Sequence, residues 1–248
     1  MRGRASRERT DGLRGGLHLF ECVCPALFFG TVDREAPIDL HCHKPIMDRL
    51  TLDLIQQIDR LWEEVYPYLA AHIYEVYGRS TGTVVEIGPF CGVIFELLKR
   101  RSGSSFLIGT FPPGMGRFFA GQAERQGFAG EVGIVETDPS LSALTTSSID
   151  LAIFRGALFF PSLFRTDFRA IDRILRPGGM AFIGGGFGKY TPPSVINAMA
   201  TRSRELNLMI GKAEVTEKAV LHDLASSGID AHAEIVNEGG LWVIMKKG

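Results

Sequence analysis

One short loop carries residues that could bind a small charged ligand. The run Glu86-Ile-Gly-Pro-Phe-Cys-Gly92 follows an apolar stretch, 83–87, that has the length and composition of a buried strand. Gly88 permits a sharp turn out of that strand, and Gly92 lets a following helix pack closely while its first N–H groups face a ligand. The spacing is not the G-x-G-x-x-G of dinucleotide folds, which argues against a nicotinamide enzyme. The loop predicts a ligand site, with a tight turn that binds nothing as the alternative.

The elements around this loop predict a parallel sheet with helices on both faces. Short β-rich runs alternate with helical stretches, a pattern typical of α/β folds. The expected strands are 83–87, 105–110, 131–136, 149–154 and 179–184, and the expected helices lie near 91–101, 114–126, 162–175 and 192–209. Ligands of such sheets bind beyond the carboxyl ends of the strands. The residues that follow each strand are therefore the candidates for chemistry.

The two ends of the chain complete the expected architecture. A helix near 215–227 precedes two strands joined by a tight turn at 238–240, which predicts an antiparallel hairpin. Residues 47–78 show apolar side chains at spacings of three and four, with Pro67 expected to kink or split the helix and Gly78 to end it. The prediction is a Rossmann-like α/β fold: a seven-stranded, mostly parallel sheet with a C-terminal antiparallel hairpin and an N-terminal helical segment.

Residues 1–46 differ in composition and are expected to form a poorly ordered or accessory extension ahead of a domain spanning 47–248. Five arginines occupy the first fourteen positions and an apolar patch follows, which imitates a signal peptide. Glu21 and Pro25 interrupt the apolar patch and argue against secretion. The alternative to such an extension is that the natural start is Met47 and that residues 1–46 are dispensable. The cluster of Cys22, Cys24, His41, Cys42 and His43 matches no closed zinc pattern, so no metal site is expected.

Composition narrows the classes of partner. The formal net charge is −1, from 27 basic and 28 acidic side chains, so no global field attracts nucleic acid or an anionic membrane. No apolar run reaches the roughly 20 residues that span a bilayer. Four cysteines in 248 residues do not make a disulfide scaffold. A cytoplasmic protein with a small-molecule partner is expected; the oligomeric state is left open, with a homodimer as one alternative.

Four motifs, taken together, resemble the class I S-adenosylmethionine-dependent methyltransferases. They are "VVEIGPFCG", "VETDPSL", "IDLAIFRGALFF" and "FRAIDRILRPGGMAFIGGG", and they occur in that family's order over roughly residues 80–187. The resemblance implies S-adenosylmethionine as cofactor, with Asp138 accepting from the adenine amino group and Glu86 orienting the amino end or the loop. The implied cofactor-binding residues are Glu86, Gly88, Pro89, Phe90, Gly92, Thr110, Phe111, Thr137, Asp138, Pro139, Arg155, Gly156 and Ala157.

Two positions depart from the family pattern. Phe90 stands where the family usually has glycine, although O-methyltransferase branches resemble this chain in placing an aromatic residue there. Phe111 stands where the family usually has an acid that binds both ribose hydroxyls. Losing that charge-assisted contact costs about 1.5–3 kcal/mol of binding free energy, part of which stacking on the adenine could recover. The ribose end of the site is therefore expected to be weak or rebuilt.

The resemblance implies a methyltransferase that acts on a small molecule, with the helices of 47–78 as a lid over the acceptor. Aromatic residues suggest a pocket for an apolar or planar acceptor, with Arg155 or Lys189 holding an anionic group; the alternative is ordinary core and solvated cations. The expected substrate-binding residues are Phe160, Phe164, Lys189 and Tyr190, and no catalytic residue is identified. A non-catalytic binder of the same cofactor is the alternative function, and an aminopropyltransferase is a weaker one. The acceptor atom stays open.

Overall fold

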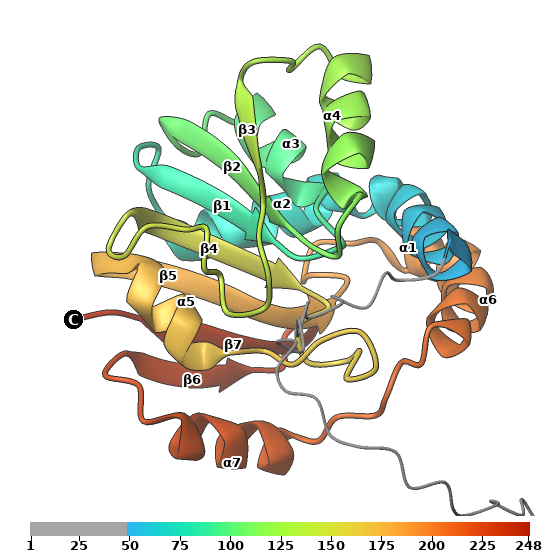
Figure 1. Ribbon diagram of the computed structural model, residues 1–248. Helices are drawn as coiled ribbons and strands as arrows, with labels where there is room; N and C mark the ends of the chain where they lie inside the picture. The colour runs from blue at the N-terminus through green and yellow to red at the C-terminus, as the bar shows by residue number, and fades with distance from the viewer. Residues whose placement is uncertain (1–48) are drawn as a thin grey trace, which may run out of the picture. The chain divides into compact units, whose positions relative to one another are not determined.

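A computed structural model describes residues 49–248, and they are built around one seven-stranded sheet (Figure 1). The strand order is β3-β2-β1-β4-β5-β7-β6. All neighbours pair in parallel except β7, which is antiparallel to both β5 and β6. The strands are β1 Thr83–Ile87, β2 Ser105–Thr110, β3 Val132–Glu136, β4 Ile149–Arg155, β5 Leu175–Gly186, β6 His232–Val236 and β7 Gly240–Lys246. The predicted fold class, including the antiparallel hairpin, is confirmed.

Helices cover both faces of this sheet. Figure 1 shows α5 in front of the strands and α2 and α3 behind them. The α-helices are α1 Arg49–Leu61, α2 Tyr66–Tyr77, α3 Val93–Lys99, α4 Met115–Arg125, α5 Phe168–Ile174, α6 Pro193–Met209 and α7 Glu217–Ser227, and a short 3-10 helix spans Trp62–Glu64. Among the helix pairs, α2 packs on α3 and α1 packs on α6.

The helical segment that starts the described chain is split as its sequence predicts. Pro67 lies in the first turn of α2, where its missing N–H costs no intrahelical bond. The helix ends at Gly78, whose φ of 64° is the left-handed conformation that glycine adopts without strain. The result is two helices joined by a 3-10 turn, with buried side chains on both, including Ile55, Leu69 and Ile73.

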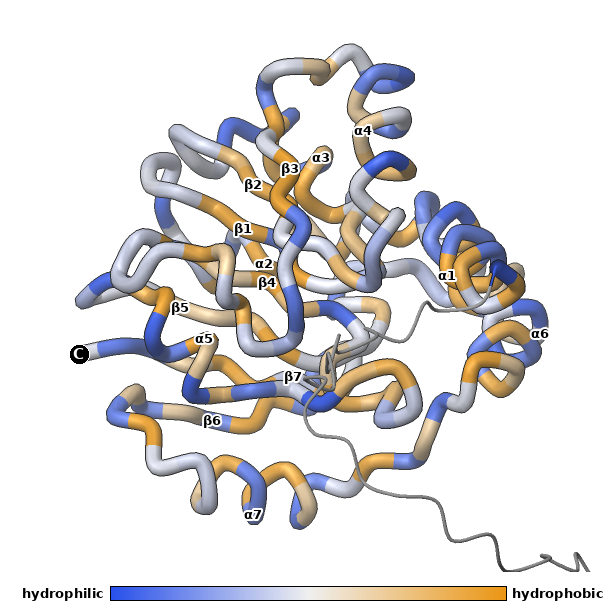
Figure 2. The backbone as a smooth tube through the Cα atoms, viewed as in Figure 1, coloured by the Kyte–Doolittle hydropathy of each residue, from blue (hydrophilic) through white to orange (hydrophobic). Residues whose placement is uncertain are grey.

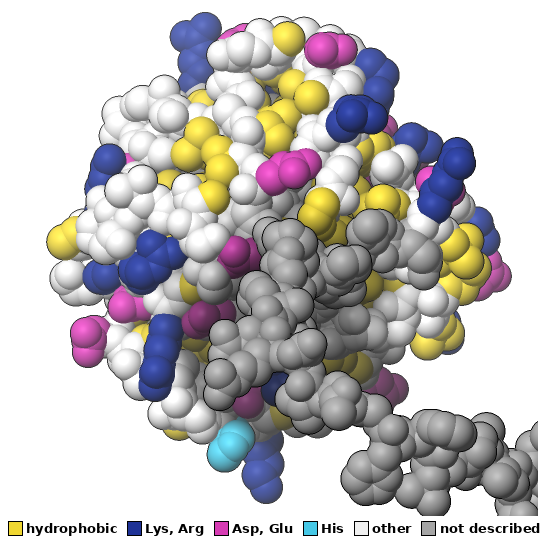
Figure 3. All heavy atoms as spheres, viewed as in Figure 1, with side chains coloured by type: hydrophobic (Ala, Val, Ile, Leu, Met, Phe, Trp, Pro, Cys, Tyr) yellow, Lys and Arg dark blue, Asp and Glu magenta, His cyan; other side chains and the backbone are white. Residues whose placement is uncertain are grey.

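The central strands are buried on both faces, as expected for a parallel sheet. Val84, Val85 and Ile87 of β1 are fully buried, and Figure 2 shows the hydrophobic residues concentrated on the central strands. Trp242 of β7 is also fully buried and packs on Phe182 of β5, with ring centroids 4.5 Å apart. On the face drawn in Figure 3, basic and acidic side chains are interspersed, in keeping with a net charge of −1.

The predicted helix at 162–175 is wrong at its start. The helix begins at Phe168, with Asp167 as its N-cap: the Asp167 carboxylate accepts from the Ala170 N–H at 3.0 Å. A loop of turns and irregular backbone precedes it, and Phe160 and Phe164 are buried there outside any helix. The strand that follows begins at Leu175, four residues before the predicted position. Apolar residues in a packed loop therefore imitated the periodicity of a helix.

Predictions for the N-terminal extension lie outside the described residues. These are the extension at 1–46 and the residues Cys22, Cys24, His41, Cys42 and His43. Within residues 49–248, the helices are all too short or too polar to cross a bilayer.

Candidate functional site

The candidate site lies where the strand order of the sheet reverses. Strands β1 and β4 are neighbours, and the chain proceeds from β1 to β2 on one side and from β4 to β5 on the other. In open α/β sheets the loops leaving such a pair of strands diverge and leave a crevice at their carboxyl ends. The loops that begin at Gly88 and Gly156 meet there.

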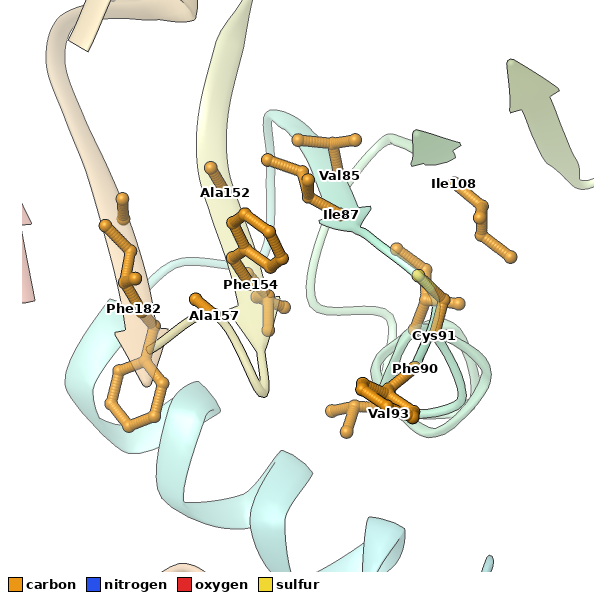
Figure 4. Packing of buried hydrophobic residues seen from close by; sticks show 14 of the residues in the cluster. Val85, Ile87, Phe90, Cys91, Val93, Ile108, Ala152, Phe154, Ala157 and Phe182 are labelled. Atoms are coloured by element: carbon orange, nitrogen blue, oxygen red, sulfur yellow. The ribbon is translucent and has the colours of Figure 1, made fainter. Parts of the chain in front are cut away.

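The loop after β1 is held by close contacts at its two glycines. Gly88 has a φ of 99°, and a Cβ placed on it would lie 2.7 Å from the Phe154 ring, so a larger residue would be both strained and obstructed. Figure 4 shows Phe154 on β4, the strand beside the one that carries Ile87. At Gly92 a Cβ would lie 2.0 Å from the ring of Tyr66, which brings α2 against the start of α3. Phe90, between them, is 1% exposed and lies 5.0 Å from Phe160, centroid to centroid.

Glu86 is a fully buried carboxyl group with one satisfied oxygen. Its Oε2 accepts from the Ile94 N–H at 2.8 Å, whereas Oε1 has no hydrogen-bond partner in the described part of the chain. Burial raises the pKa of Glu86 from 4.5 to about 8, against the opposing effects of Arg155 and of the Ile94 N–H. A buried, unpaired acceptor at this point is what a cationic or hydrogen-bonding ligand group would satisfy.

Arg155, the last residue of β4, is the centre of a buried polar network. Its Nη2 lies 3.2 Å from Asp59 Oδ1 and donates to the Tyr66 hydroxyl at 2.5 Å. Tyr66 in turn donates to Asp59 at 2.5 Å, and Gln122 Nε2 donates to the other Asp59 oxygen at 2.8 Å. Burial raises the pKa of Asp59, while the Arg155 charge opposes that rise. The network ties α1, α2 and α4 to the end of β4.

Two donors beside this network have no partner in the described chain. The Arg155 guanidinium lies near three aromatic rings, with its Cζ 5.1 Å from the centroid of Trp62, 4.9 Å from Tyr66 and 5.4 Å from Phe90. Its Nε–H and the Trp62 indole N–H are both buried and unpaired. The indole ring itself stacks on Phe187, with centroids 4.9 Å apart. Unpaired buried donors of this kind are uncommon and suit a ligand that brings acceptor atoms.

The positions expected to bind the ribose and adenine have other partners. Phe111 is 5% exposed and packs edge-to-face on Phe154 and Phe164, at 5.9 and 5.3 Å. The Thr110 hydroxyl donates to the Gly88 carbonyl at 3.3 Å. The position where the family usually has an acid therefore holds the Phe111 ring, which is already packed against two other rings.

Asp138 is held by its own loop. Its two oxygens accept from the hydroxyls of Ser140 and Ser142, each at 2.5 Å, and one also accepts from the Ser140 N–H at 2.8 Å. These bonds, with Ser140 foremost, lower the pKa of Asp138 to about 2. The neighbouring Thr137 hydroxyl accepts from the Ala143 N–H at 3.3 Å. The carboxylate stays ionised and able to accept a further hydrogen bond.

A cavity of about 960 Å³ adjoins the β4 end of this crevice. Four of the residues expected at the site line it: Phe90, Arg155, Gly156 and Phe160. Its other lining residues are Ile58, Trp62, Phe159, Gly185, Gly186, Phe187, Ala200, Ser203, Arg204, Asn207, Leu208, Lys212, Ala213, Glu214, Val215, Thr216 and Leu241. The expected ribose and adenine residues are not part of the lining.

Three of the four expected substrate-binding residues lie outside the lining of this cavity. Lys189 forms an ion pair with Glu75 at 2.7 Å, and the Tyr190 hydroxyl donates to the same carboxylate. Phe164 belongs to the ring cluster with Phe111 and Phe154. Arg155 does line the cavity, yet its charge already faces Asp59. The aromatic part of the expected pocket is therefore present, whereas the expected cations are engaged.

Sequence reasoning missed Asp59, Tyr66 and two of the cations that line the cavity, Arg204 and Lys212. One signal for Asp59 was available: it follows Ile55 by four residues and precedes Trp62 by three, which places an acid on the apolar face of a helix. Arg204, within α6, and Lys212, three residues beyond its end, carry no comparable signal.

Comparison with known proteins gives similarity at the level of structure. No protein-family model matches the chain, and no curated protein matches it by sequence. A crystal structure from Methanococcus maripaludis, provisionally assigned as an S-adenosyl-L-methionine-dependent methyltransferase, aligns with a TM-score of 0.65 at 24% identity, over 88% of this chain and 97% of that one. PigF, solved with S-adenosylhomocysteine, gives 0.58 at 18% identity, over 80% of this chain and 60% of its own. A provisionally assigned O-methyltransferase from Nostoc punctiforme gives 0.55 at 12% identity, with the same coverages.

Proposed function

We propose that this chain, which has the fold of the class I S-adenosylmethionine-dependent methyltransferases, binds S-adenosylmethionine at the carboxyl ends of β1, β2 and β4 and methylates a small molecule. The observation that carries the proposal is the cavity of about 960 Å³, because Phe90, Arg155 and Gly156 line it. Those three are among the thirteen residues that the family resemblance assigns to the cofactor. A volume of this size accommodates a small organic ligand.

The residues present fit the amino-acid end of the cofactor. That end is a zwitterion, so it needs a group that accepts hydrogen bonds and a group that donates them. Glu86 offers an unpaired buried oxygen, and Arg155 offers an unpaired N–H. Gly88 and Gly156, with φ of 99° and 77°, keep the backbone of both loops free of side chains. We therefore assign this end to Glu86, Gly88, Arg155 and Gly156, with Pro89, Gly92 and Ala157 in the same two loops.

The ribose end fits less well. Phe111 supplies no hydrogen-bond acceptor, so an affinity roughly ten- to a hundredfold below that of a site with the usual acid is expected. Thr110, Thr137, Asp138 and Pro139 remain the proposed contacts of the adenosine, and of these Asp138 offers an ionised carboxylate.

S-adenosylmethionine, when bound, supplies a methyl group that is attached to a positively charged sulfur. That sulfur is an activated leaving group. The chain's part is then chiefly to orient the acceptor, since alignment alone can contribute several powers of ten to the rate. Phe90 and Phe160 form an apolar wall that excludes water. The ion pair with Asp59 keeps the Arg155 guanidinium fixed. A general base is needed only for an acceptor that loses a proton.

Calorimetry with S-adenosylmethionine and S-adenosylhomocysteine tests the proposal. We expect binding of both, weaker than in enzymes that bind the ribose through an acid. An absence of heat for either compound at about millimolar concentration would contradict the proposal.

The second candidate is a non-catalytic binder of the same cofactor, and Phe111 motivates it. Incubation with a methyl-labelled cofactor and a metabolite pool separates the two. Labelled product excludes the non-catalytic role, whereas binding without turnover across many acceptors favours it.

A further inference from the structure

We infer that the cavity beside Arg155 binds a planar, apolar molecule that carries an anionic group, with Arg204 and Lys212 holding the anion. The inference rests on the proposed function only where it identifies that molecule as the methyl acceptor. It differs from the expectation drawn from the sequence, which gave the anion to Arg155 or Lys189. Both of those cations face a carboxylate, whereas Arg204 and Lys212 form no ion pair with an acid among residues 49–248.

The charge on the cavity wall is unevenly balanced. Its described lining contains three cations, Arg155, Arg204 and Lys212, and one acid, Glu214. Arg155 is compensated by Asp59 at 3.2 Å. Neither Arg204 nor Lys212 forms an ion pair with an acid within residues 49–248. An uncompensated pair of cations at the edge of a cavity favours a ligand of negative charge.

The two cations act on each other. Lys212 lies over the ring of Phe159, with Nζ 5.2 Å from the centroid. Burial lowers the pKa of Lys212, and the charge of Arg204 lowers it further. An anion placed between the two groups would relieve that repulsion. Because Arg204 is exposed, the attraction should weaken as salt is added.

Helix α6 gives this side of the cavity its polar character. Ser203 and Asn207 lie one turn apart, are buried and share a hydrogen bond of 3.2 Å, and both line the cavity beside Arg204. The segment after the helix is tied to the aromatic loop, because the Ala213 N–H donates to the Phe159 carbonyl at 2.8 Å and Ser162 donates to the Ile210 carbonyl at 3.0 Å. These two hydrogen bonds fix the position of Lys212 relative to the aromatic rings.

Four aromatic rings form another part of the wall. The stacked pair of Trp62 and Phe187 lines it, as do Phe159 and Phe160. Flat rings with a stacked pair favour a planar ligand body over a flexible polar one. The unpaired indole N–H of Trp62 can donate one hydrogen bond to an acceptor atom of the planar ligand. Shape and charge together point to one class of molecule, an aromatic or similarly planar carboxylate or phosphate ester.

Calorimetry on the full chain with 2-naphthoate and 2-naphthamide tests the inference, because the two compounds share a ring body and differ in charge. We expect the carboxylate to bind at least about tenfold more tightly than the amide at low salt. The double variant Arg204→Gln/Lys212→Gln should abolish that preference and leave the affinity for the amide unchanged. The control Arg202→Gln/Lys218→Gln removes the same charge from side chains that do not line the cavity, and it should change neither affinity.

Equal affinities of the two compounds, no binding of either at about millimolar concentration, or an unchanged preference in the double variant would overturn the inference. Titration with S-adenosylhomocysteine on the same proteins separates this result from the proposed function. Binding of S-adenosylhomocysteine without preference for the carboxylate overturns the inference alone. Preference for the carboxylate without binding of S-adenosylhomocysteine supports an anion-binding cavity and contradicts the cofactor proposal.

Discussion

Glu86 couples the stability of this protein to pH through a single proton. Its pKa is about 8 in the folded chain against an ordinary 4.5, because burial disfavours the charged form. Between these two pH values the folded state holds a proton that the unfolded state has lost. The stabilising effect of protonation is therefore complete below about pH 4.5 and is lost as the pH rises through about 8.

We predict that Glu86→Gln removes this dependence. The free energy of unfolding of the wild type should fall relative to the variant by up to about 1.4 kcal/mol per pH unit within that window. Denaturant unfolding of both proteins at about pH 5 and about pH 8 measures it. Asp59 also has a raised pKa and contributes in the same direction, so the difference between variant and wild type is the quantity to compare. A constant difference across the window would contradict the prediction.

Arg155 and Asp59 form the second residue-scale test. Arg155→Met leaves the Asp59 carboxylate buried without its cation and should destabilise the fold by about 3–5 kcal/mol. Adding Asp59→Asn removes the stranded charge, so the double variant should be more stable than the sum of the single effects predicts, by about 1 kcal/mol or more. Denaturant unfolding of the four proteins gives this coupling energy. Strict additivity would show that the two groups do not stabilise each other.

Residues in local motifs could be predicted from the sequence, and residues in long-range networks could not. Gly88 and Glu86 belong to one strand and its turn, where local rules of backbone conformation apply. By contrast, Asp59 precedes its partner Arg155 by 96 positions, and Glu75 precedes Lys189 by 114. Sequence alone does not show that a cation is already paired. The prediction that Arg155 or Lys189 holds an anion was therefore made without knowing that each of them already has a carboxylate partner.

At the scale of elements, strands were easier to locate than the loop that carries the aromatic residues. Parallel strands are continuous apolar runs because both faces are covered, and β1, β2 and β3 lie within one residue of the predicted bounds. The start of α5 was missed because Phe160 and Phe164 imitate helical spacing while packing in turns. Asp167, a good N-cap, marks the true boundary and was a readable signal.

Gly92 controls how closely α2 approaches α3, which gives a prediction for that pair. A Cβ on Gly92 would lie 2.0 Å from the Tyr66 ring, so Gly92→Ala must displace either the ring or the helix. We expect a loss of about 1–3 kcal/mol in the free energy of unfolding, as for other overpacked cores.

Gly121→Ala is the matched control for Gly92→Ala. Gly121 lies within α4, and the nearest contact of an added Cβ is the flexible Arg125 side chain at 3.4 Å. Alanine there should be neutral or stabilise the protein by up to about 1 kcal/mol, because it favours the helix. Thermal and denaturant unfolding of both variants measure the effects. Equal stability of the two variants would show that the contact between Gly92 and Tyr66 yields without cost.

At the scale of the whole molecule, the sequence predicted seven strands and their directions, but the order of the sheet follows from long-range pairing. Neither the periodicity nor the motifs predicted that β4 returns beside β1. That reversal creates the crevice, so the site could be located to one edge of the sheet. The part of the cavity wall that α6 forms could not be located from the sequence, because it depends on where α6 packs after the chain leaves β5.

The described region should behave as a complete folding unit, which gives the last prediction. Within residues 49–248, seven strands form one sheet, and a hydrophobic core extends from Leu54 to Met245. A chain that begins at Met47 keeps every one of these residues, together with the network of Asp59, Tyr66 and Arg155. We expect one cooperative thermal transition within about 2 °C of that of the full chain, since a change of 1 kcal/mol shifts the midpoint by about 2–4 °C at this size. The dissociation constant for S-adenosylhomocysteine should agree within about threefold, as measured by calorimetry on both proteins. A broad transition, or an affinity about tenfold lower, would show that residues 1–46 take part in the fold or in the site.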